Sequence, residues 1–492
     1  MSSTQTASQS PRSLRSAWVA LAGLSAVFLF EMLDNSILNV ALPTIGRELR
    51  ASATGLQWVT GAYAVLFGGS MLLFGAIADR VGRRRVMLIG LGLLGAASLA
   101  TAFVTTEGEL IAVRALMGVA AAMTAPGSIA LAFRLFEDDT LRVRAISLIS
   151  TVGLVGLAIG PTAGGLVLAF APWQVLLLVN VPVAVLAFIG IRTGISADSA
   201  AELHRDPVDV AGAVLGTTAI VLALVAPTLF VNEGVGSWAP WSTAVAAAVV
   251  TTLFIVRERR APHPLLDLTL LAAPLVASGL AYKAATGLAV AGLSYVATLQ
   301  LQLDYGWPPA LAAIGLLPQV IVLLAVGPFV SRLVERLGFD RAAWLSAASV
   351  VVGLAVYGLC NGLGYPWVAL ALALVAAGIR VNGVVAGTNV LRGLPANRTS
   401  IGSALVDTAS EVSTGVSLAV VGTVIAALFT GDFAAGHWSS QQAAEFHQAV
   451  SIGTLALAGA AALLVGWGYH RGQRSRGGDD GPVQQEGIDH AG

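Results

Sequence analysis

Apolar stretches of about 20 residues, separated by short polar connections, recur along the whole chain. A helix of that length crosses the hydrocarbon core of a bilayer. We therefore predict an all-α membrane protein with fourteen spans. The predicted spans lie at residues 17–40, 56–78, 86–103, 110–133, 145–170, 174–191, 208–231, 241–256, 275–299, 310–334, 342–361, 367–391, 400–429 and 446–469.

Composition favours the same class of protein. Of the 492 residues, 56% are hydrophobic and only 11% are charged, and the mean hydropathy is +0.81. Soluble domains carry about 25% charged residues, so a water-soluble globular protein is excluded. The segments at residues 1–16 and 470–492 are polar, and we expect them to be disordered tails.

The basic residues divide unequally between the two sets of connections. With the N-terminus in the cytoplasm, and with Arg332 at the end of the tenth span counted in the loop that follows it, 22 of the 27 arginines and lysines fall in cytoplasmic loops and tails, two in the opposite loops and three inside spans. Positive charge gathers on the cytoplasmic side of membrane proteins. The bias predicts that both termini are cytoplasmic, and it supports the even span count because one missed helix would invert every later loop.

The sequence lacks the motifs and the charge that would indicate several other functional classes. The formal net charge is zero, which gives no electrostatic case for nucleic acid. Cys360 is the single cysteine, and the six histidines, expected in loops or termini, show no metal-ligand spacing. A phosphate-binding Gly-Lys-Ser/Thr loop is absent, as are the GxSxG and HExxH motifs of hydrolases. We predict no cofactor and no metal, and we keep a membrane enzyme or receptor only as a remote alternative.

The connection after the second predicted span has an unusual composition. Residues 75–85 read GAIADRVGRRR, with a glycine suited to a tight turn and an aspartate beside an arginine cluster. This segment can form a cytoplasmic ion-pair latch, or it can be a basic loop with a turn. The candidate gate residues are Gly75, Asp79, Arg80, Gly82 and Arg83.

A second pattern lies in the fifth predicted span, where residues 153–165 read GLVGLAIGPTAGG. Glycines at intervals of four share one helical face and permit close helix approach, and the proline can kink the helix. Ordinary packing of small residues is the alternative interpretation. The residues of this motif are Gly156, Gly160, Pro161, Gly164 and Gly165.

These motifs together resemble those of a known family. GAIADRVGRRR is similar to the GxxxDRxGRR signature of the major facilitator superfamily. The first span, which reads LDNSILNVALP over residues 33–43, looks like the LDxTxxNVALP element of its fourteen-span drug:proton antiporters. The glycine-rich fifth span is similar to the GxxxGPxxGG antiporter motif.

The resemblance implies an architecture and a mode of action. A six-helix bundle is expected at residues 17–191, a linker with two inserted helices at 192–274, and a second six-helix bundle at 275–469. In this family the two bundles rock about a site near the bilayer midplane. An exporter of drug-like compounds is the implied activity, with antibiotic or antiseptic resistance as a consequence.

Four acids fall in the interior of predicted spans, away from the span ends, where a charge is costly and therefore a functional candidate. Glu31 and Asp34 are spaced i,i+3 on the first span, and Asp407 and Glu411 are spaced i,i+4 on the thirteenth, so each pair shares a helical face. Two carboxyls in such a setting can bind and release a proton near neutral pH. We expect this group to couple proton entry to cargo export, although Glu31 can equally have no role.

Three bases also fall inside spans. Arg114 can pair with an acid of the first half or take part in a proton relay, and Arg380 can neutralise Asp407 or Glu411. Lys283, the single lysine of the chain, either pairs with an acid or contacts an anionic or neutral substrate.

The sequence thus predicts a proton-coupled antiporter for amphiphilic compounds, which we expect to be cationic, in a bacterial cytoplasmic membrane. Its partners are a small-molecule substrate, protons and the lipid bilayer, and we expect a monomer. An exporter of an anionic or zwitterionic metabolite, anchored by Lys283 and Arg380, is the alternative.

Overall fold

The computed structural model describes residues 13–136, 138–198, 209–262, 264, 268–394, 399–431 and 438–474. Helices account for nearly all of these residues. The helices that precede residue 265 are α1 (Trp18–Leu49), α2 (Ala53–Val81), α3 (Arg83–Ala100), η1 (Thr101–Phe103), α4 (Glu107–Leu135), α5 (Asp139–Leu168), α6 (Gln174–Leu178), α7 (Asn180–Gly194), α8 (Val210–Glu233) and α9 (Trp238–Arg260).

Among the later helices, some long spans are interrupted or extended by short helical elements. They are α10 (Leu268–Ala272), α11 (Pro274–Leu299), η2 (Gln300–Asp304), α12 (Pro309–Gly315), α13 (Leu317–Val326), η3 (Gly327–Phe329), α14 (Val330–Leu337), α15 (Phe339–Cys360), η4 (Asn361–Leu363), α16 (Tyr365–Arg392), α17 (Thr399–Leu428) and α18 (Ser440–Arg474).

Thirteen helical segments within the described residues are long and apolar enough to cross a membrane. They coincide with thirteen of the fourteen predicted spans, and the remaining one, at 56–78, forms α2. The predicted span at 310–334 is not a single α-helix, because it is divided into α12, α13, η3 and α14. Prolines at positions 318 and 328 stand at these divisions, where they can begin a helical segment but cannot continue the preceding one.

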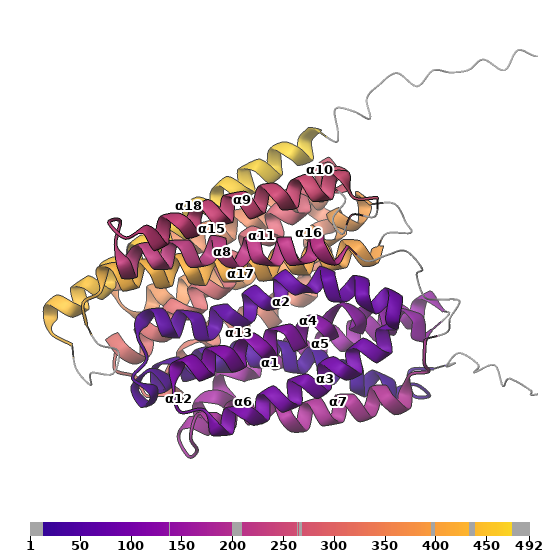
Figure 1. Ribbon diagram of the computed structural model, residues 1–492, viewed down its shortest axis with the longest axis horizontal. Coiled ribbons are helices and arrows are strands. Elements are labelled where there is room, and N and C mark those ends of the chain that lie inside the picture. The colour runs from indigo at the N-terminus through magenta and orange to yellow at the C-terminus, as the bar shows by residue number, and fades with distance from the viewer. Residues whose placement is uncertain are drawn as a thin grey trace, which may run out of the picture.

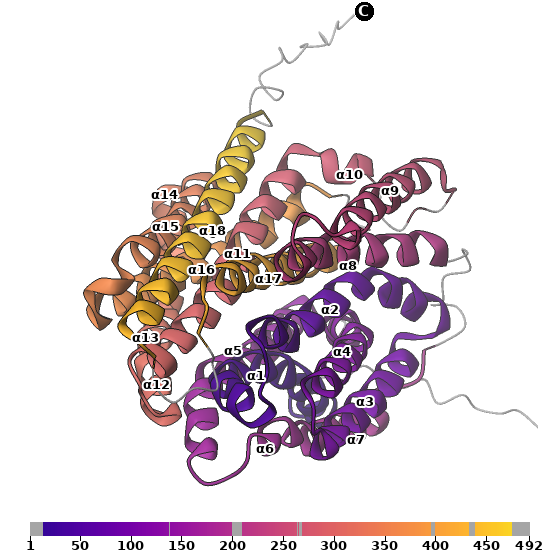
Figure 2. The same ribbon diagram turned by 60° about the vertical axis from the view of Figure 1, so that its left-hand side comes forward.

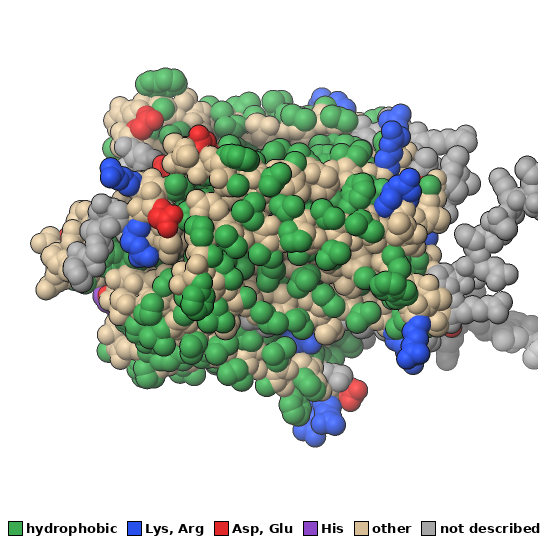
Figure 3. All heavy atoms as spheres, turned by 90° about the horizontal axis from the view of Figure 1, so that it is seen from below, with side chains coloured by type: hydrophobic (Ala, Val, Ile, Leu, Met, Phe, Trp, Pro, Cys, Tyr) green, Lys and Arg blue, Asp and Glu red, His purple; other side chains and the backbone are tan. Residues whose placement is uncertain are grey.

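The long helices run side by side along the long axis of the molecule (Figure 1). α1 begins and α18 ends at one end, which we name the terminal end. α1 ends and α18 begins at the other end, which we name the distal end. Charged side chains on the face shown in Figure 3 gather toward the two ends, and hydrophobic side chains cover the surface between them. Such a belt suits a bilayer as the surrounding solvent.

Two groups of helices are visible in Figure 2, one containing α1 to α7 and the other containing α11 to α18. In the first group α1 packs on α5 and α7, and α2 packs on α4. In the second group α11 packs on α16, α17 and α18. α8 and α9 form a hairpin beside α2 and α17, and α2 packs on α17 across the boundary between the two groups. The exact domain boundaries stay predictions.

The glycine stripe of α5 lies against α1, as close helix approach requires. A Cβ atom at Gly156 would stand 3.0 Å from the carbonyl oxygen of Leu29, and one at Gly164 would stand 2.7 Å from the Ile37 side chain. Gly165 instead faces the other group of helices, because a Cβ there would stand 2.7 Å from the carbonyl oxygen of Pro309 on α12. The small residues therefore bring α5 close to both neighbours.

The turn between α2 and α3 depends on one glycine. Gly82 has a φ of +114°, a conformation that side-chain-bearing residues rarely adopt, and it separates the two helices. The carboxylate of Asp198 approaches this position, since a Cβ on Gly82 would stand 2.8 Å from its Oδ2 atom. The tight turn predicted at Gly82 is therefore present.

We predict that Gly82→Ala destabilises the protein by about 1–3 kcal/mol, because the new methyl group meets both backbone strain and the Asp198 carboxylate. The midpoint of thermal unfolding of the purified protein measures the effect. Gly92→Ala is the matched control, since Gly92 lies within α3 and a Cβ there meets nothing within 4 Å. Equal midpoints for the two variants would contradict the prediction.

Candidate functional site

A cavity of about 490 Å³ lies between the two groups of helices. Its walls come from α1, α2 and α5 on one side and from α11, α13, α16 and α17 on the other. Most of the lining is apolar, with hydroxyl and amide groups interspersed. The volume falls within the range of small-molecule sites in proteins.

Three charged side chains line this cavity, namely Lys283 on α11, Arg380 on α16 and Glu411 on α17. Within the described part of the chain, neither base has a carboxylate within ion-pair distance. Arg380 Nε is buried without a hydrogen-bond partner among those residues, and the same holds for Glu411 Oε2. The expected ion pair between Arg380 and Asp407 or Glu411 is therefore not formed in this structure.

Acids from the two groups of helices are brought together beside the cavity. The charges of Asp407, Glu411 and Lys283 all act on the carboxyl of Glu31, which belongs to α1. The charge of Lys283 also acts on both acids of α17, and the charge of Asp407 acts on Glu411. Three carboxyls and one amine thus form an electrostatic cluster at the boundary between the groups of helices. Two of the four, Lys283 and Glu411, line the cavity itself.

Close packing of α2 on α17 holds these acids in place. A Cβ on Gly68 would stand 2.8 Å from the Cβ of Glu411, so the two helices nearly touch there. Thr217 on α8 donates a hydrogen bond to the carbonyl oxygen of Gly69, at 2.7 Å. The hairpin of α8 and α9 therefore supports α2 at the level of the acid cluster.

Asp34 and Arg114 form a sealed ion pair rather than part of the cavity wall. Arg114 Nη1 donates to Asp34 Oδ2 at 2.5 Å, and both side chains are fully buried. Arg114 Nε also donates to the carbonyl oxygen of Val59, at 3.2 Å, and its guanidinium lies 4.4 Å from the ring centre of Tyr63. The partner that the sequence analysis expected for Arg114 within the first half is therefore Asp34.

Asn180 completes this pair, and the sequence analysis did not select it. Its Nδ2 atom donates to Asp34 Oδ1 at 2.8 Å, from the first residue of α7. Asn180 follows the fully buried Trp173 in the sequence WQVLLLVN over residues 173–180. An asparagine directly after the apolar run VLLLV at residues 175–179 is the signal that could have marked it, because a buried amide needs partners.

The arginine-rich connection between α2 and α3 lies at the terminal end. It is held there by contacts with residues that lie outside the GAIADRVGRRR segment. Arg84 Nη2 donates to the carbonyl oxygen of Arg192 at 2.5 Å, which places it at the C-terminal end of α7. Asp198 accepts from the backbone N–H of Arg84 at 3.1 Å and pairs with Arg134 at 2.6 Å. The side chain of Asp79 lies outside the described part of the structure, so its role in a latch stays a prediction.

The distal end of the cavity is closed by contacts between the two groups of helices. Gln302 Nε2 on η2 donates to the carbonyl oxygen of Val40 on α1, at 2.8 Å. Gly165 packs against Pro309 of α12, and Gln57 of α2 packs against Gly422 of α17. Gly153 and Pro161 of the glycine-rich segment line the cavity below this closure. These contacts join the two groups of helices on the distal side of the cavity.

Sequence comparison assigns the family. The model of the Major Facilitator Superfamily matches residues 24–418. This chain belongs to the major facilitator superfamily. It is a multi-pass membrane transporter, and the proteins of known fold that it resembles are transporters rather than enzymes.

Individual relatives show which transporters of the superfamily this chain is similar to. The methyl viologen resistance protein SmvA of Salmonella typhimurium is 28% identical over 416 residues, which cover 84% of this chain and 83% of that protein. The cephamycin export protein CmcT of Amycolatopsis lactamdurans is 30% identical over 426 residues, which cover 85% and 82%. Other relatives include multidrug and antibiotic resistance proteins. The homologues of this superfamily member are thus drug and multidrug resistance exporters.

A solved structure supports the fold alone. The POT-family transporter PepTSo superposes with a TM-score of 0.68 at 14% sequence identity, and the match covers 96% of this chain and 100% of that one.

The sealed ion pair generates a prediction about stability. Asp34→Asn leaves the fully buried Arg114 without a counter-charge, and Arg114→Met leaves Asp34 with Asn180 alone. Each change should cost about 3–5 kcal/mol of stability, because removal of one partner strands a buried charge. The double variant should lose less than the sum of the two single losses, as measured by thermal unfolding of the purified proteins. Additive losses would contradict an interaction between the two residues.

Proposed function

We propose that the protein is a proton-coupled antiporter that exports amphiphilic, drug-like compounds, mainly cations, by alternating access. The observation that carries this proposal is the acid cluster beside the cavity, where Glu31, Asp407 and Glu411 come together from both groups of helices. A buried carboxylate needs compensation, which a proton or a cationic cargo can supply in turn. Competition between the two for the same carboxyls produces antiport.

The proton gradient is the energy source in this proposal. A proton that moves down a membrane potential gains about 2.3 kcal/mol per 100 mV, and a pH gradient adds to this. No cofactor is needed for such a mechanism, and we propose that none is used. The small-molecule cargo, protons and lipid are then the partners of a monomeric transporter.

The proposed orientation rests on the basic residues of the chain. We place the terminal end in the cytoplasm of a bacterial inner membrane, because 22 of the 27 arginines and lysines then lie on that side. With α2 counted as a span, fourteen helices cross the bilayer as in the drug:proton antiporter branch. The closed distal end then faces outward, which corresponds to a conformation that is ready to take cargo from the cytoplasmic side.

Ethidium efflux from pump-deficient bacterial cells tests the proposal. Cells that express the protein should extrude ethidium, and a protonophore should stop the extrusion. Glu411→Gln and Asp407→Asn should each reduce the efflux rate at least about tenfold, because neither amide can exchange a proton with the cargo.

Glu335→Gln serves as the matched control, since Glu335 is an exposed acid on α14 outside the cavity. This variant should transport like the wild type. Efflux that survives the protonophore, or that is unaffected by Glu411→Gln, would contradict the proton-coupled mechanism.

A second candidate function has a specific observation in its favour. Lys283 and Arg380 both line the cavity, and the described residues place no carboxylate within ion-pair distance of either. In a cavity that binds only cations, two such bases would weaken binding, because each repels a positive charge. An anionic or zwitterionic metabolite would satisfy them, with its amine toward Glu411 in the zwitterionic case.

Substitution of the bases separates the two candidates. Lys283→Met and Arg380→Met should preserve or increase the efflux of a cation such as ethidium, because each removes a repulsive charge. For an anionic or zwitterionic cargo the same variants should lose transport, with a cost of about 2–5 kcal/mol if each base makes a buried ion pair with the cargo. Rates measured with dyes of opposite charge in the same cells decide between them.

A further inference from the structure

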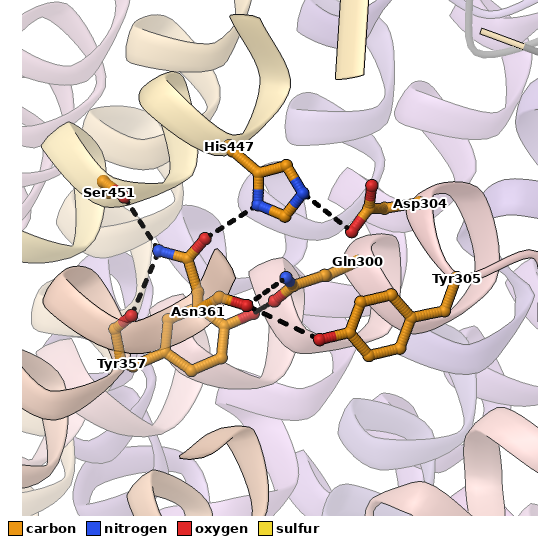
Figure 4. Close-up of polar contacts among 7 residues, drawn as sticks. All are labelled: Gln300, Asp304, Tyr305, Tyr357, Asn361, His447 and Ser451. Carbon is orange, nitrogen blue, oxygen red and sulfur yellow. Dashed lines mark hydrogen bonds and ion pairs between the residues drawn. The ribbon is translucent and has the colours of Figure 1, made fainter. Parts of the chain in front are cut away.

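A polar network lies at the distal end of the second group of helices, apart from the cavity lining (Figure 4). His447 stands at its centre and lies near the start of α18, so the expectation that the histidines lie in loops or termini is wrong for this residue. On one side of the ring Nε2 lies 3.1 Å from Asp304 Oδ2, and on the other side Nδ1 lies 3.0 Å from Asn361 Oδ1.

The orientation of the Asn361 amide is fixed by its other contacts. Its Nδ2 atom lies 3.1 Å from the carbonyl oxygen of Tyr357, 3.3 Å from that of Gly358 and 2.8 Å from Ser451 Oγ. Carbonyl oxygens only accept hydrogen bonds, so the nitrogen of the amide must face them. The atom that faces His447 is therefore the amide oxygen, which is also only an acceptor.

Both ring nitrogens of His447 consequently face acceptors. An imidazole with one N–H can satisfy one of them, whereas the imidazolium ion donates from both nitrogens. The contact with Asp304 is an ion pair by distance rather than an aligned hydrogen bond, because Asp304 Oδ2 has no hydrogen-bond partner among the described residues. If His447 lost a proton, the ring would keep one N–H for Asn361 and would lose the positive charge that attracts Asp304. The geometry therefore selects the protonated form of the ring as the one that completes the network.

No other basic group on the elements around the network can take that role. No lysine or arginine occurs within residues 284–331, 342–379 or 399–470, which supply these elements. Besides Asp304, the ionisable groups that belong to the network are the phenols of Tyr305 and Tyr357. Glu445, on the same helix as His447, instead accepts hydrogen bonds from Thr430, at 3.1 Å from the backbone N–H and 2.5 Å from Oγ1.

Solvent can exchange protons with this site. The His447 side chain retains 31% of its accessible surface, while Asp304 retains 9%. The site is thus open to water at the distal surface, and its anionic partner is largely shielded. A shielded carboxylate strengthens an ion pair relative to one that is fully exposed.

The network also holds the turn that closes the cavity. η2 is a π-helical turn, a rare element that often occurs at functional sites. Its first residue, Gln300, donates to the carbonyl oxygen of Asn361 at 3.0 Å and accepts from the Tyr357 hydroxyl at 2.6 Å. Its last residue, Asp304, pairs with His447, and between them Gln302 crosses to α1. One of the contacts that close the distal end, the bond from Gln302 to Val40, is therefore carried by a turn that this network anchors at both ends.

We propose that the His447–Asp304 pair is a proton-binding site at the distal face, and that its occupied form favours closure of the distal end through η2. A proton taken up there stabilises the conformation in which Gln302 binds the carbonyl oxygen of Val40. Linkage requires the reverse as well, so the closed conformation binds the proton more tightly than the open one. This inference rests on the proposed function for the assignment of the distal end to the outside, where protons would drive the return of an empty exporter.

Distances between spin labels on the full-length protein in lipid nanodiscs test the proposal. The labels are carried by non-natural amino acids at Phe170 and Leu363, two exposed distal positions on different groups of helices, which leaves Cys360 in place. The short-distance population should dominate at about pH 5 and should give way to a longer one toward about pH 8, the range in which histidine changes its charge. The ratio of closed to open protein should fall about tenfold or more.

Variants identify the group that titrates. His447→Gln should abolish the pH response, and Asp304→Asn should move it to lower pH because the imidazolium loses its counter-charge. Gln302→Ala should lengthen the distance at every pH, since it removes the bond to α1. Ser451→Ala is the matched control, because it removes a bond to Asn361 without touching His447 or Asp304.

The cavity acids titrate too, so Glu411→Gln is measured beside these variants. A wild-type pH response in His447→Gln that is lost in Glu411→Gln would overturn the proposal and assign the response to the cavity. Magnetic resonance of protein with carbon-13-labelled histidine gives a second readout. The signal that disappears in a folded His447→Gln sample belongs to His447. In the wild type this signal must show an imidazolium in the closed state. A neutral ring there would also overturn it. Failure of ethidium efflux with an intact distance response would instead contradict the proposed transport function alone.

Discussion

A charge inside a bundle of apolar helices has to be compensated by a partner, a proton or a ligand, and the arrangement of this transporter follows from that constraint. Asp34 and Arg114 form a fully buried ion pair that does not line the cavity. Lys283, Arg380 and Glu411 instead face the cavity. Acids and bases are thereby divided into a buried structural pair and a group that lines the cavity.

The sequence predicted the parts of this arrangement that depend on local pattern. The spans follow from runs of apolar residues, and the close contact of α5 with α1 follows from glycines that recur every four residues. It also placed Asp407 and Glu411 on one helical face. It could not show that Glu31 lies close enough for their charges to act on it, because Glu31 belongs to α1 and its position relative to α17 depends on how the two groups of helices pack.

Other features escaped prediction for physical reasons. Asn180 gains its role only through a contact with Asp34, 146 positions earlier in the chain. Apolar residues that line the cavity cannot be separated from packing residues by periodicity, because the helices are apolar on every face. The π-helical turn η2 is stabilised by bonds to Asn361 and His447, which no local propensity encodes. Helix α11 joins this turn to Lys283, so one element connects the distal network with the cavity.

Competition between protons and cargo for the cavity carboxyls is the central claim, and proton release on cargo binding tests it most directly. Purified protein in a weakly buffered solution with a pH indicator is mixed with ethidium near neutral pH. The account predicts that binding displaces protons into the solution, and that Glu411→Gln releases fewer. Binding without any release of protons would contradict the account, because the cargo and the proton would then not share a site.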